Sequence, residues 1–160
     1  DNITALFLPI SQAIYPHICK LADQSHIKAL KFIRKILFAA GCCNFILSLL
    51  LFIFADKIVW LLLGDGYEKS VLLLQIMAFL PFVISLSNIF GVQTMLTFGL
   101  QNYFSQILMS AAILNIVAVL PFIYFYKAVG VSCVIIFIEI YVTVLMWYIL
   151  KKNNLDLFKS

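Results

Sequence analysis

Glu139 has the clearest capacity for chemistry in this sequence, because it is the only acidic or basic side chain in the apolar run 128–150. If that run crosses a bilayer, a charged carboxylate at its centre costs roughly 2.5–3.5 kcal/mol. The group should then be protonated, paired, or turned toward a protein interior or a wet cavity. It could relay a proton or a cation, or offer a polar contact to a solute. The alternative is a structural carboxylic acid that is hydrogen-bonded to a neighbouring helix.

Polar residues recur at helical spacing around this carboxyl. Steps of three and four residues bring Ser132 and Thr143 onto the same helix face as Glu139, together with Ile136 and Met146. We therefore take Ser132, Glu139 and Thr143 as candidates for one polar path through the membrane.

A second polar stripe precedes it, formed by Ala78, Pro81, Ser85 and Asn88, and Gln93 follows. Pro81 removes a backbone hydrogen bond, so we expect a kink or a break there. Broken helices expose backbone groups to substrates and ions in transporters. The alternative is close helix packing with a tolerated kink, which we favour for Ser85. Asn88 and Gln93 remain pathway candidates.

The remaining polar positions carry weaker signals. His17 lies beside Pro16 and could contact an anionic headgroup, although an interfacial histidine with no such role is the alternative. Small and polar residues between 105 and 126 are expected to pack helices together. The candidate kinks are at Pro9, Pro16, Pro81 and Pro121.

No pattern points to an enzyme, a cofactor or a metal. The sequence contains no nucleophile elbow, zinc-protease motif, phosphate-binding glycine loop or convincing pair of carboxylates. Its cysteines show no zinc-type spacing with histidine, and we interpret them as small apolar residues: Cys19, Cys42, Cys43 and Cys133.

The composition requires a membrane. The chain is 64% hydrophobic and 11% charged, whereas soluble domains carry about 25% charged residues. No charged residue occurs from 70 to 126. As one straight helix that stretch would be about 85 Å long, far more than a hydrocarbon core of about 30 Å. It must therefore fold back on itself as a hairpin.

These patterns predict an all-α, polytopic transmembrane bundle. We expect five membrane segments, at about 3–19, 36–55, 71–93, 105–126 and 128–150. An amphipathic surface helix at 27–37 should lead into the second segment. A short interfacial helix should begin after Lys57 and end at Gly64-Asp65-Gly66, with Trp60 and Tyr67 at headgroup depth.

Basic residues set the expected orientation. Eight lie on one side of the expected segments: Lys20, Lys28, Lys31, Arg34, Lys35, Lys151, Lys152 and Lys159. The other side carries three: Lys57, Lys69 and Lys127. The positive-inside rule places the first group, and the C-terminus, in the cytoplasm. We interpret the net charge of +4 as a topology signal and not as a sign of nucleic-acid binding.

Four stretches also carry a resemblance to a known family: residues 9–23 (PISQAIYPHICKLAD), 55–82 (ADKIVWLLLGDGYEKSVLLLQIMAFLPF), 87–99 (SNIFGVQTMLTFG) and 130–139 (GVSCVIIFIE). In their joint order and spacing they resemble the C-terminal part of the Wzx-type O-antigen flippases. That family belongs to the multidrug/oligosaccharidyl-lipid/polysaccharide transporter superfamily. We read the chain, which starts at Asp1 without Met, as a C-terminal fragment.

The resemblance implies twelve helices in two six-helix lobes, with a central cavity that opens alternately to each side of the bacterial inner membrane. This chain would supply five helices of the second lobe. The implied cargo is an undecaprenyl-diphosphate-linked oligosaccharide, moved to the periplasmic face, with a proton or sodium as coupling ion. Glu139, Asn88 and Gln93 match family-like polar positions, and the cations for the diphosphate would come from the missing N-terminal lobe.

Three other classes stay open. One is an exporter of drugs or other organic ions from the same superfamily, which would differ in the chemistry of its cavity. Another is a membrane enzyme such as an O-antigen polymerase or glycosyltransferase, although such enzymes need larger extramembrane loops than the short ones expected here. The third is an accessory membrane subunit that transports nothing, against which the polar stripes argue.

Overall fold

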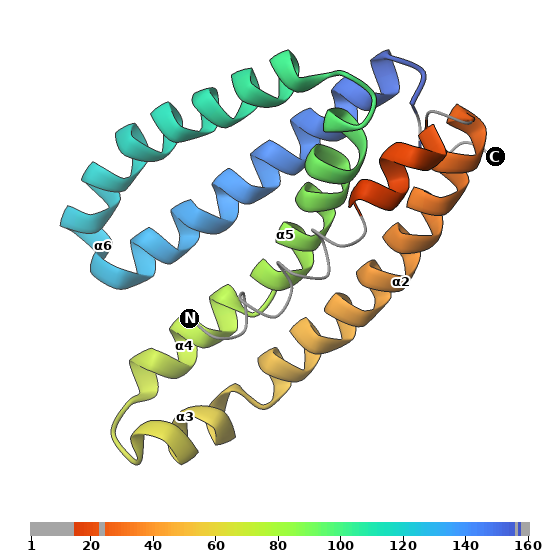
Figure 1. Cartoon of the computed structure of the whole chain (residues 1–160). Helices are drawn as coiled ribbons and strands as arrows, with labels where there is room; N and C mark the ends of the chain where they lie inside the picture. Colours follow the sequence, from red (N-terminus) through yellow and green to blue (C-terminus); the bar gives the residue numbers. More distant parts are fainter. Residues whose placement is uncertain (1–14, 23–24, 156, 158–160) are drawn as a thin grey trace.

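The computed structural model describes residues 15–22, 25–155 and 157, and these residues form helices and no strand. The helices lie side by side as an elongated bundle (Figure 1). Residues 15–22 are helical and include the end of the first expected segment. The rest of that segment, with Pro9, lies outside the described residues.

Helix α2 runs without a break from His26 to Ile53. The surface helix expected at 27–37 and the second membrane segment are thus one helix, because no proline or reversing glycine separates them. At ~1.5 Å per residue it is about 42 Å long, so its basic first turns project beyond a hydrocarbon core of about 30 Å. Its inner stripe is buried and consists of Ala29, Ile33, Leu37, Gly41, Asn44 and Ser48.

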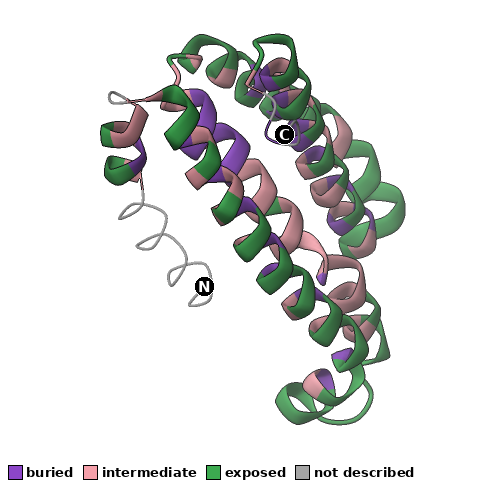
Figure 2. Cartoon of the chain, turned by 90° about the vertical axis from the view of Figure 1, so that its right-hand side faces the viewer, coloured by how far each residue is buried: buried purple, intermediate pink, exposed green. Residues whose placement is uncertain are grey.

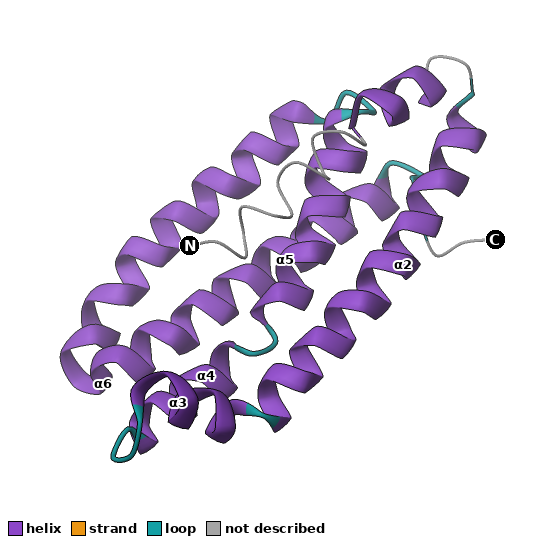
Figure 3. Ribbon diagram, turned by 60° about the horizontal axis from the view of Figure 1, so that its bottom comes forward, coloured by secondary structure: helices purple, strands orange, loops and turns teal. Residues whose placement is uncertain are grey.

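Helix α3, from Ala55 to Leu63, is the short helix expected before the glycine pair. It ends at Gly64, whose φ of 81° lies in the left-handed region that favours glycine. Gly66, with φ of 93°, completes the reversal toward the next helix. Figures 1 and 3 show α3 at one end of the bundle, turned away from the line of α2.

The third apolar run is broken into three parts. Helix α4 spans Glu68–Met77, α5 spans Leu80–Asn88, and a wide π-helical segment, η1, spans Ile89–Leu96. Pro81 lies in the first turn of α5, where the missing N–H would have no partner within the helix. The break therefore comes before the proline, at Ala78 and Phe79.

Helix α6, from Gln101 to Lys152, is a hairpin of two limbs that meet at Lys127. Lys127 has non-helical angles (φ 51°, ψ −133°), and the chain doubles back there (Figure 1). A Cβ at Gly130 would lie 2.5 Å from the carbonyl oxygen of Phe122, so only glycine permits this close approach. Pro121 lies inside the first limb, not at the turn.

Three runs are long and apolar enough to cross a membrane: His26–Ile53, Glu68–Leu96 and Gln101–Lys152. The last holds two such lengths, because it folds back at Lys127. Figure 2 shows exposed residues along the outer faces and buried ones between the helices. Because the exposed faces are rich in Leu, Ile and Phe, the bundle is built for a lipid solvent. The predicted all-α transmembrane bundle is confirmed.

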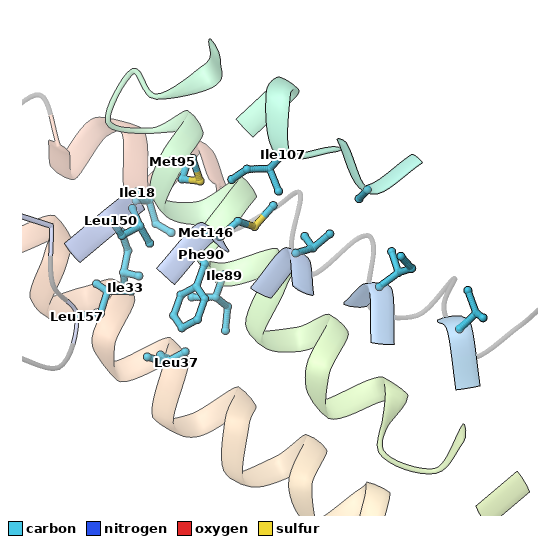
Figure 4. Close-up of a cluster of buried hydrophobic side chains, with 14 residues drawn as sticks. Ile18, Ile33, Leu37, Ile89, Phe90, Met95, Ile107, Met146, Leu150 and Leu157 are labelled. Atoms are coloured by element: carbon cyan, nitrogen blue, oxygen red, sulfur yellow. The ribbon is translucent and has the colours of Figure 1, made fainter. Parts of the chain in front are cut away.

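The tightest packing lies at the end of the bundle where α2 begins and α6 ends. Ile18, Ile33, Met95, Met146 and Leu150 converge there from four segments (Figure 4), and each is at most 2% exposed. By contrast, α4 and α5 contain no fully buried residue. The middle of the bundle, around α5, is therefore only partly shielded from its surroundings.

Candidate functional site

A cavity of about 180 Å³ lies between α5 and η1 on one side and the two limbs of α6 on the other. Its lining is mostly apolar, with three polar side chains, and consists of Ile84, Ser87, Asn88, Val92, Phe104, Leu108, Glu139, Val142 and Met146. The cavity lies beside α5, a short helix between the break before Leu80 and the wide η1 segment.

Glu139 is half-buried in this cavity, which Ser87 of α5 also lines. The Ser87 hydroxyl lies 3.1 Å from the carbonyl oxygen of Ile84, to which it donates. A hydroxyl has only one hydrogen to donate, so it can serve one acceptor at a time.

The hydrogen bonds of Ser87 can therefore depend on the protonation state of Glu139. A protonated carboxyl donates to Ser87, and Ser87 then keeps its bond to the Ile84 carbonyl. An ionised carboxylate needs the Ser87 hydrogen for itself. Gain or loss of one proton at Glu139 can therefore change which acceptor the Ser87 hydroxyl serves.

Asn88 lines the same cavity and makes polar interactions of its own. Together with Glu139 and Ser87 it forms a polar corner of carboxyl, hydroxyl and amide groups in an otherwise apolar pocket. Such a corner can hold a proton, a small cation or a polar group of a solute. None of the residues that line the cavity is basic.

The other candidates on the Glu139 helix do not reach the cavity. Ser132 is buried, and its hydroxyl donates to the carbonyl of Ala128 at 3.0 Å. The Thr143 hydroxyl donates to the backbone carbonyl of Glu139 at 2.7 Å. Both hydroxyls bond to the preceding turn of their own helix, as serine and threonine commonly do in apolar helices.

Gln93 and His17 also lie away from the cavity lining. Gln93 is 2% exposed within η1 and makes interactions there. His17 is exposed, and its ring packs against Phe32 of α2 with centroids 5.2 Å apart. The six candidates thus separate into a pair that shares the cavity, Glu139 and Asn88, and four that do not.

Ser87 is the functional candidate that sequence reasoning missed. It falls one residue off the stripe that runs through Ser85 and Asn88, so helical spacing alone did not single it out. The usable signal was the run of polar residues at 85, 87 and 88, which is wide enough to face two neighbours.

Ser85 faces the other neighbour of α5. The Asn44 side chain on α2 donates to the Ala40 carbonyl at 2.8 Å and lies 3.3 Å from the Ser85 hydroxyl. One turn further along α2, Ser48 is fully buried, and its hydroxyl has no hydrogen-bond partner among the described residues. A polar contact therefore links α5 to α2 on one side, and Ser87 and Asn88 face the cavity beside α6 on the other.

No group of three or more metal-binding side chains occurs in the described part of the chain. The four cysteines are free, and Cys19 lies 4.0 Å from the Thr97 hydroxyl. The three polar residues of the cavity offer one carboxylate only, so they suit a proton or a monovalent cation better than a resident transition metal.

Comparison with known proteins adds two relatives, each named "Putative O-antigen transporter". The chain is 35% identical over 155 residues to the one from Escherichia coli (strain K12), a match that covers 97% of the chain. It is 31% identical over 143 residues to the one from Shigella dysenteriae, covering 88% of the chain. The chain is related to the O-antigen transporters. The resemblance of the four stretches is thereby confirmed.

The chain spans about a third of the length of these relatives, at 37% and 35%. No family model matches it, and no solved structure does. Its long apolar helices and its similarity to these relatives indicate a multi-pass membrane protein.

Proposed function

We propose that the protein containing this chain is a lipid-linked oligosaccharide flippase. It moves undecaprenyl-diphosphate-linked O-antigen, or a similar repeat unit, from the cytoplasmic to the periplasmic leaflet of the bacterial inner membrane. The observation that carries the proposal is the relationship to O-antigen transporters over nearly the whole chain. The cavity with its polar corner supports it, because polar cargo needs polar groups within the hydrocarbon layer.

This chain acts as part of one lobe. We assign to it five helices of a six-helix lobe, in a protein that works by alternating access. A diphosphate requires cationic partners in the membrane, and the described cavity has none in its lining. Those cations come from the remainder of the protein, which the relatives' greater length accommodates.

Within this lobe, Glu139 is the coupling group. Its carboxyl binds and releases a proton or a sodium ion during the cycle, and Ser87 transmits the change to α5. Ser87 and Asn88 supply the neutral oxygens that a proton or sodium needs beside a carboxylate. Ser132, Thr143, Gln93 and His17 have supporting roles in helix packing and at the membrane surface.

The orientation follows from charge. The start of α2 carries Lys28, Lys31, Arg34 and Lys35, and α6 ends with Lys151 and Lys152 at the same end of the bundle (Figure 1). The opposite end carries Lys57, Lys69 and Lys127. The basic end lies in the cytoplasm, and so does the C-terminus.

An exporter of drugs or other organic ions is the second candidate, since the mostly apolar lining of the cavity would also suit an amphipathic cation beside Glu139. A non-transporting accessory protein or a membrane enzyme has no observation in its favour among the described residues. The relatives are named as transporters.

The test is expression of the full-length protein in a strain that lacks its own O-antigen transporter but makes the matching repeat unit. Restored surface O-antigen, with unchanged drug susceptibility, is the expected result. Protein present in the membrane at normal level, no surface polysaccharide, and raised drug resistance would instead identify an exporter. Absence of both effects would favour the accessory protein.

A further inference from the structure

Helix α3 leaves four consecutive large apolar side chains uncovered. Trp60 is 62% exposed, Leu61 77%, Leu62 75% and Leu63 50%. Consecutive residues of an α-helix point about 100° apart, so these four cover every side of the helix. Only Ala55 and Val59, one turn apart near the start, are buried against the bundle. The second half of α3 therefore projects beyond the helices that hold it.

The position of α3 limits what can cover these side chains. It connects α2, which ends at Ile53, to α4, which begins at Glu68, and both of these belong to runs long enough to cross the membrane. Nine residues of helix are about 14 Å long, too short to cross a hydrocarbon core of about 30 Å. Figures 1 and 3 place α3 at the end of the bundle opposite the basic start of α2, so it lies at a membrane boundary.

The charges around α3 fit such a boundary. Asp56 and Lys57 lie in its first turn, and Asp65, Glu68 and Lys69 follow its end, so apolar residues are bracketed by groups that need water. Lys57 reaches back over the Phe54 ring, with its Nζ 5.5 Å from the centroid. Trp60 and Tyr67 combine an apolar ring with one polar atom, the combination that favours headgroup depth.

The exposed surface of α3 is also continuous with the lipid-facing end of α2. Leu50, Ile53 and Phe54 are exposed immediately before α3 begins. An apolar surface that continues the lipid-facing side of a membrane helix should also be covered by lipid. This continuity favours lipid over a second protein as the occupant.

We propose that α3 is an interfacial anchor that inserts into one bilayer leaflet, with Trp60, Leu61, Leu62 and Leu63 among the upper parts of the acyl chains. The turn of the α6 hairpin is a second anchor in the same leaflet. Tyr124, Phe125 and Tyr126 are 81%, 73% and 65% exposed beside Lys127, at the same end of the bundle (Figure 1). Together, α3 and the α6 turn fix the depth at which this end of the bundle lies in the membrane. The proposal holds whichever solute the protein moves.

The test uses spin labels on the full-length protein, made cysteine-free and reconstituted in nanodiscs of phosphatidylethanolamine and phosphatidylglycerol. Labels are placed in turn at Leu62→Cys, at Phe125→Cys, at Leu49→Cys, an exposed position in the second half of α2, and at Asp65→Cys in the loop. Collision rates with oxygen, which enters lipid, and with a water-soluble nickel chelate give the depth of each label.

The expected result is that labels at 62 and 125 collide more with oxygen than with nickel and report similar depths. Those depths should be shallower than at 49 and within about 5–10 Å of the boundary between headgroups and acyl chains. A label at 62 as open to nickel as the one at 65 would place α3 in water and overturn the proposal. A label at 62 shielded from both reagents would mean that protein covers α3, which would also overturn it.

Tryptophan fluorescence gives a second measurement that needs no cysteine. The difference between the parent and Trp60→Phe isolates the emission of Trp60. Lipids brominated near the headgroup should quench that emission more strongly than lipids brominated near the chain end. Equal emission with and without brominated lipids would contradict insertion.

Discussion

At the scale of single residues, the described structure places the Ser87 hydroxyl and the Glu139 carboxyl on the same cavity. The Ser87 hydroxyl donates to the Ile84 carbonyl of its own helix, and the carboxyl is a second possible acceptor. Because it can donate to only one of them, its bond depends on whether Glu139 carries a proton. This gives a carboxyl inside the membrane a direct effect on the neighbouring helix.

Removal of the Ser87 hydroxyl tests that link. Ser87→Ala should lower transport roughly three- to tenfold, the value of one hydrogen bond of about 1 kcal/mol. In a Glu139→Gln background the same change should cost much less, because the partner that responds to protons is already gone. Rates of O-antigen appearance at the cell surface for the four variants complete the cycle. Fully additive losses would show that the two residues act independently.

Residue identity alone singled out two of the polar side chains that line the cavity. Glu139 and Asn88 attracted attention because a carboxyl and an amide are rare in apolar runs, and both line the cavity. Ser132 and Thr143 share the helix face of Glu139, yet their hydroxyls turn back to their own backbone. Helical spacing gives the direction of a residue but not the rotamer of its side chain, so this outcome was not readable from the sequence.

At the scale of elements, glycines decide how closely the helices approach. A Cβ on Gly91 would lie 2.6 Å from the Phe104 ring and 3.0 Å from the Met146 side chain, so η1 touches both limbs of α6 through this residue. Gly41 lies in the buried stripe of α2, but a Cβ there would meet nothing within 4 Å. Gly41 therefore serves as a control for Gly91, because both lie in helices but only Gly91 is in close contact with another helix.

Substitution of each glycine by alanine should have opposite effects. Gly91→Ala overpacks the contact with α6 and should destabilise the protein by about 1–3 kcal/mol. Gly41→Ala should be neutral or stabilising by up to about 1 kcal/mol, because alanine favours a helix more than glycine does. Thermal unfolding of the full-length protein in detergent measures both. Equal stability of the two variants would contradict the packing described for η1.

The prolines form a second pair. Pro81 lies in the first turn of α5, so Pro81→Ala restores an N–H that finds no partner in the helix, and stability should change by less than about 0.5 kcal/mol. Pro121 lies inside the first limb of α6, so Pro121→Ala restores a helical hydrogen bond and should raise stability by about 1 kcal/mol or more. Chemical unfolding of both variants compares them. A larger gain in stability from Pro81→Ala than from Pro121→Ala would contradict this prediction, because it would show that Pro81 destabilises the break between α4 and α5.

Sequence patterns predicted the elements better than their junctions. The glycine-terminated helix before 64 follows from turn chemistry. The reversal inside the uncharged run 70–126 follows from membrane thickness, and it falls around Gly99, between η1 and α6. The continuity of α2 and the π-helical form of η1 do not. A basic amphipathic stretch can lie on a membrane or project from it, and the close approach of η1 to α6 at Gly91 is a tertiary contact. The Thr94 hydroxyl reaches the Ile89 carbonyl, five residues back, at 2.8 Å.

At the scale of the whole molecule, charge and packing divide the bundle into two ends. The basic end contains the tight core around Ile33, Met95 and Leu150. The opposite end carries α3 and the α6 turn, with exposed aromatic side chains. The cavity lies between them. The bundle thus has a closely packed basic end, a polar middle and an opposite end with exposed apolar side chains.

Orientation is the prediction that belongs to this scale. A reporter enzyme fused after Ser160 should be active only when it is one that works in the cytoplasm. The same reporter inserted at Asp65, between α3 and α4, should be silent there. Activity of a periplasmic reporter at the C-terminus would contradict the assigned orientation, and with it the direction of transport.

The central claim is that Glu139 acts in a flippase cycle, and one comparison tests it most directly. Glu139→Gln and Glu68→Gln are the same substitution, but Glu68 is exposed at the start of α4, away from the cavity. Surface O-antigen is scored at equal protein level in a strain that depends on the full-length protein. The account predicts loss of at least about tenfold for Glu139→Gln, equivalent to about 1.4 kcal/mol, and normal display for Glu68→Gln. Normal display by both variants would show that Glu139 is structural and contradict the account.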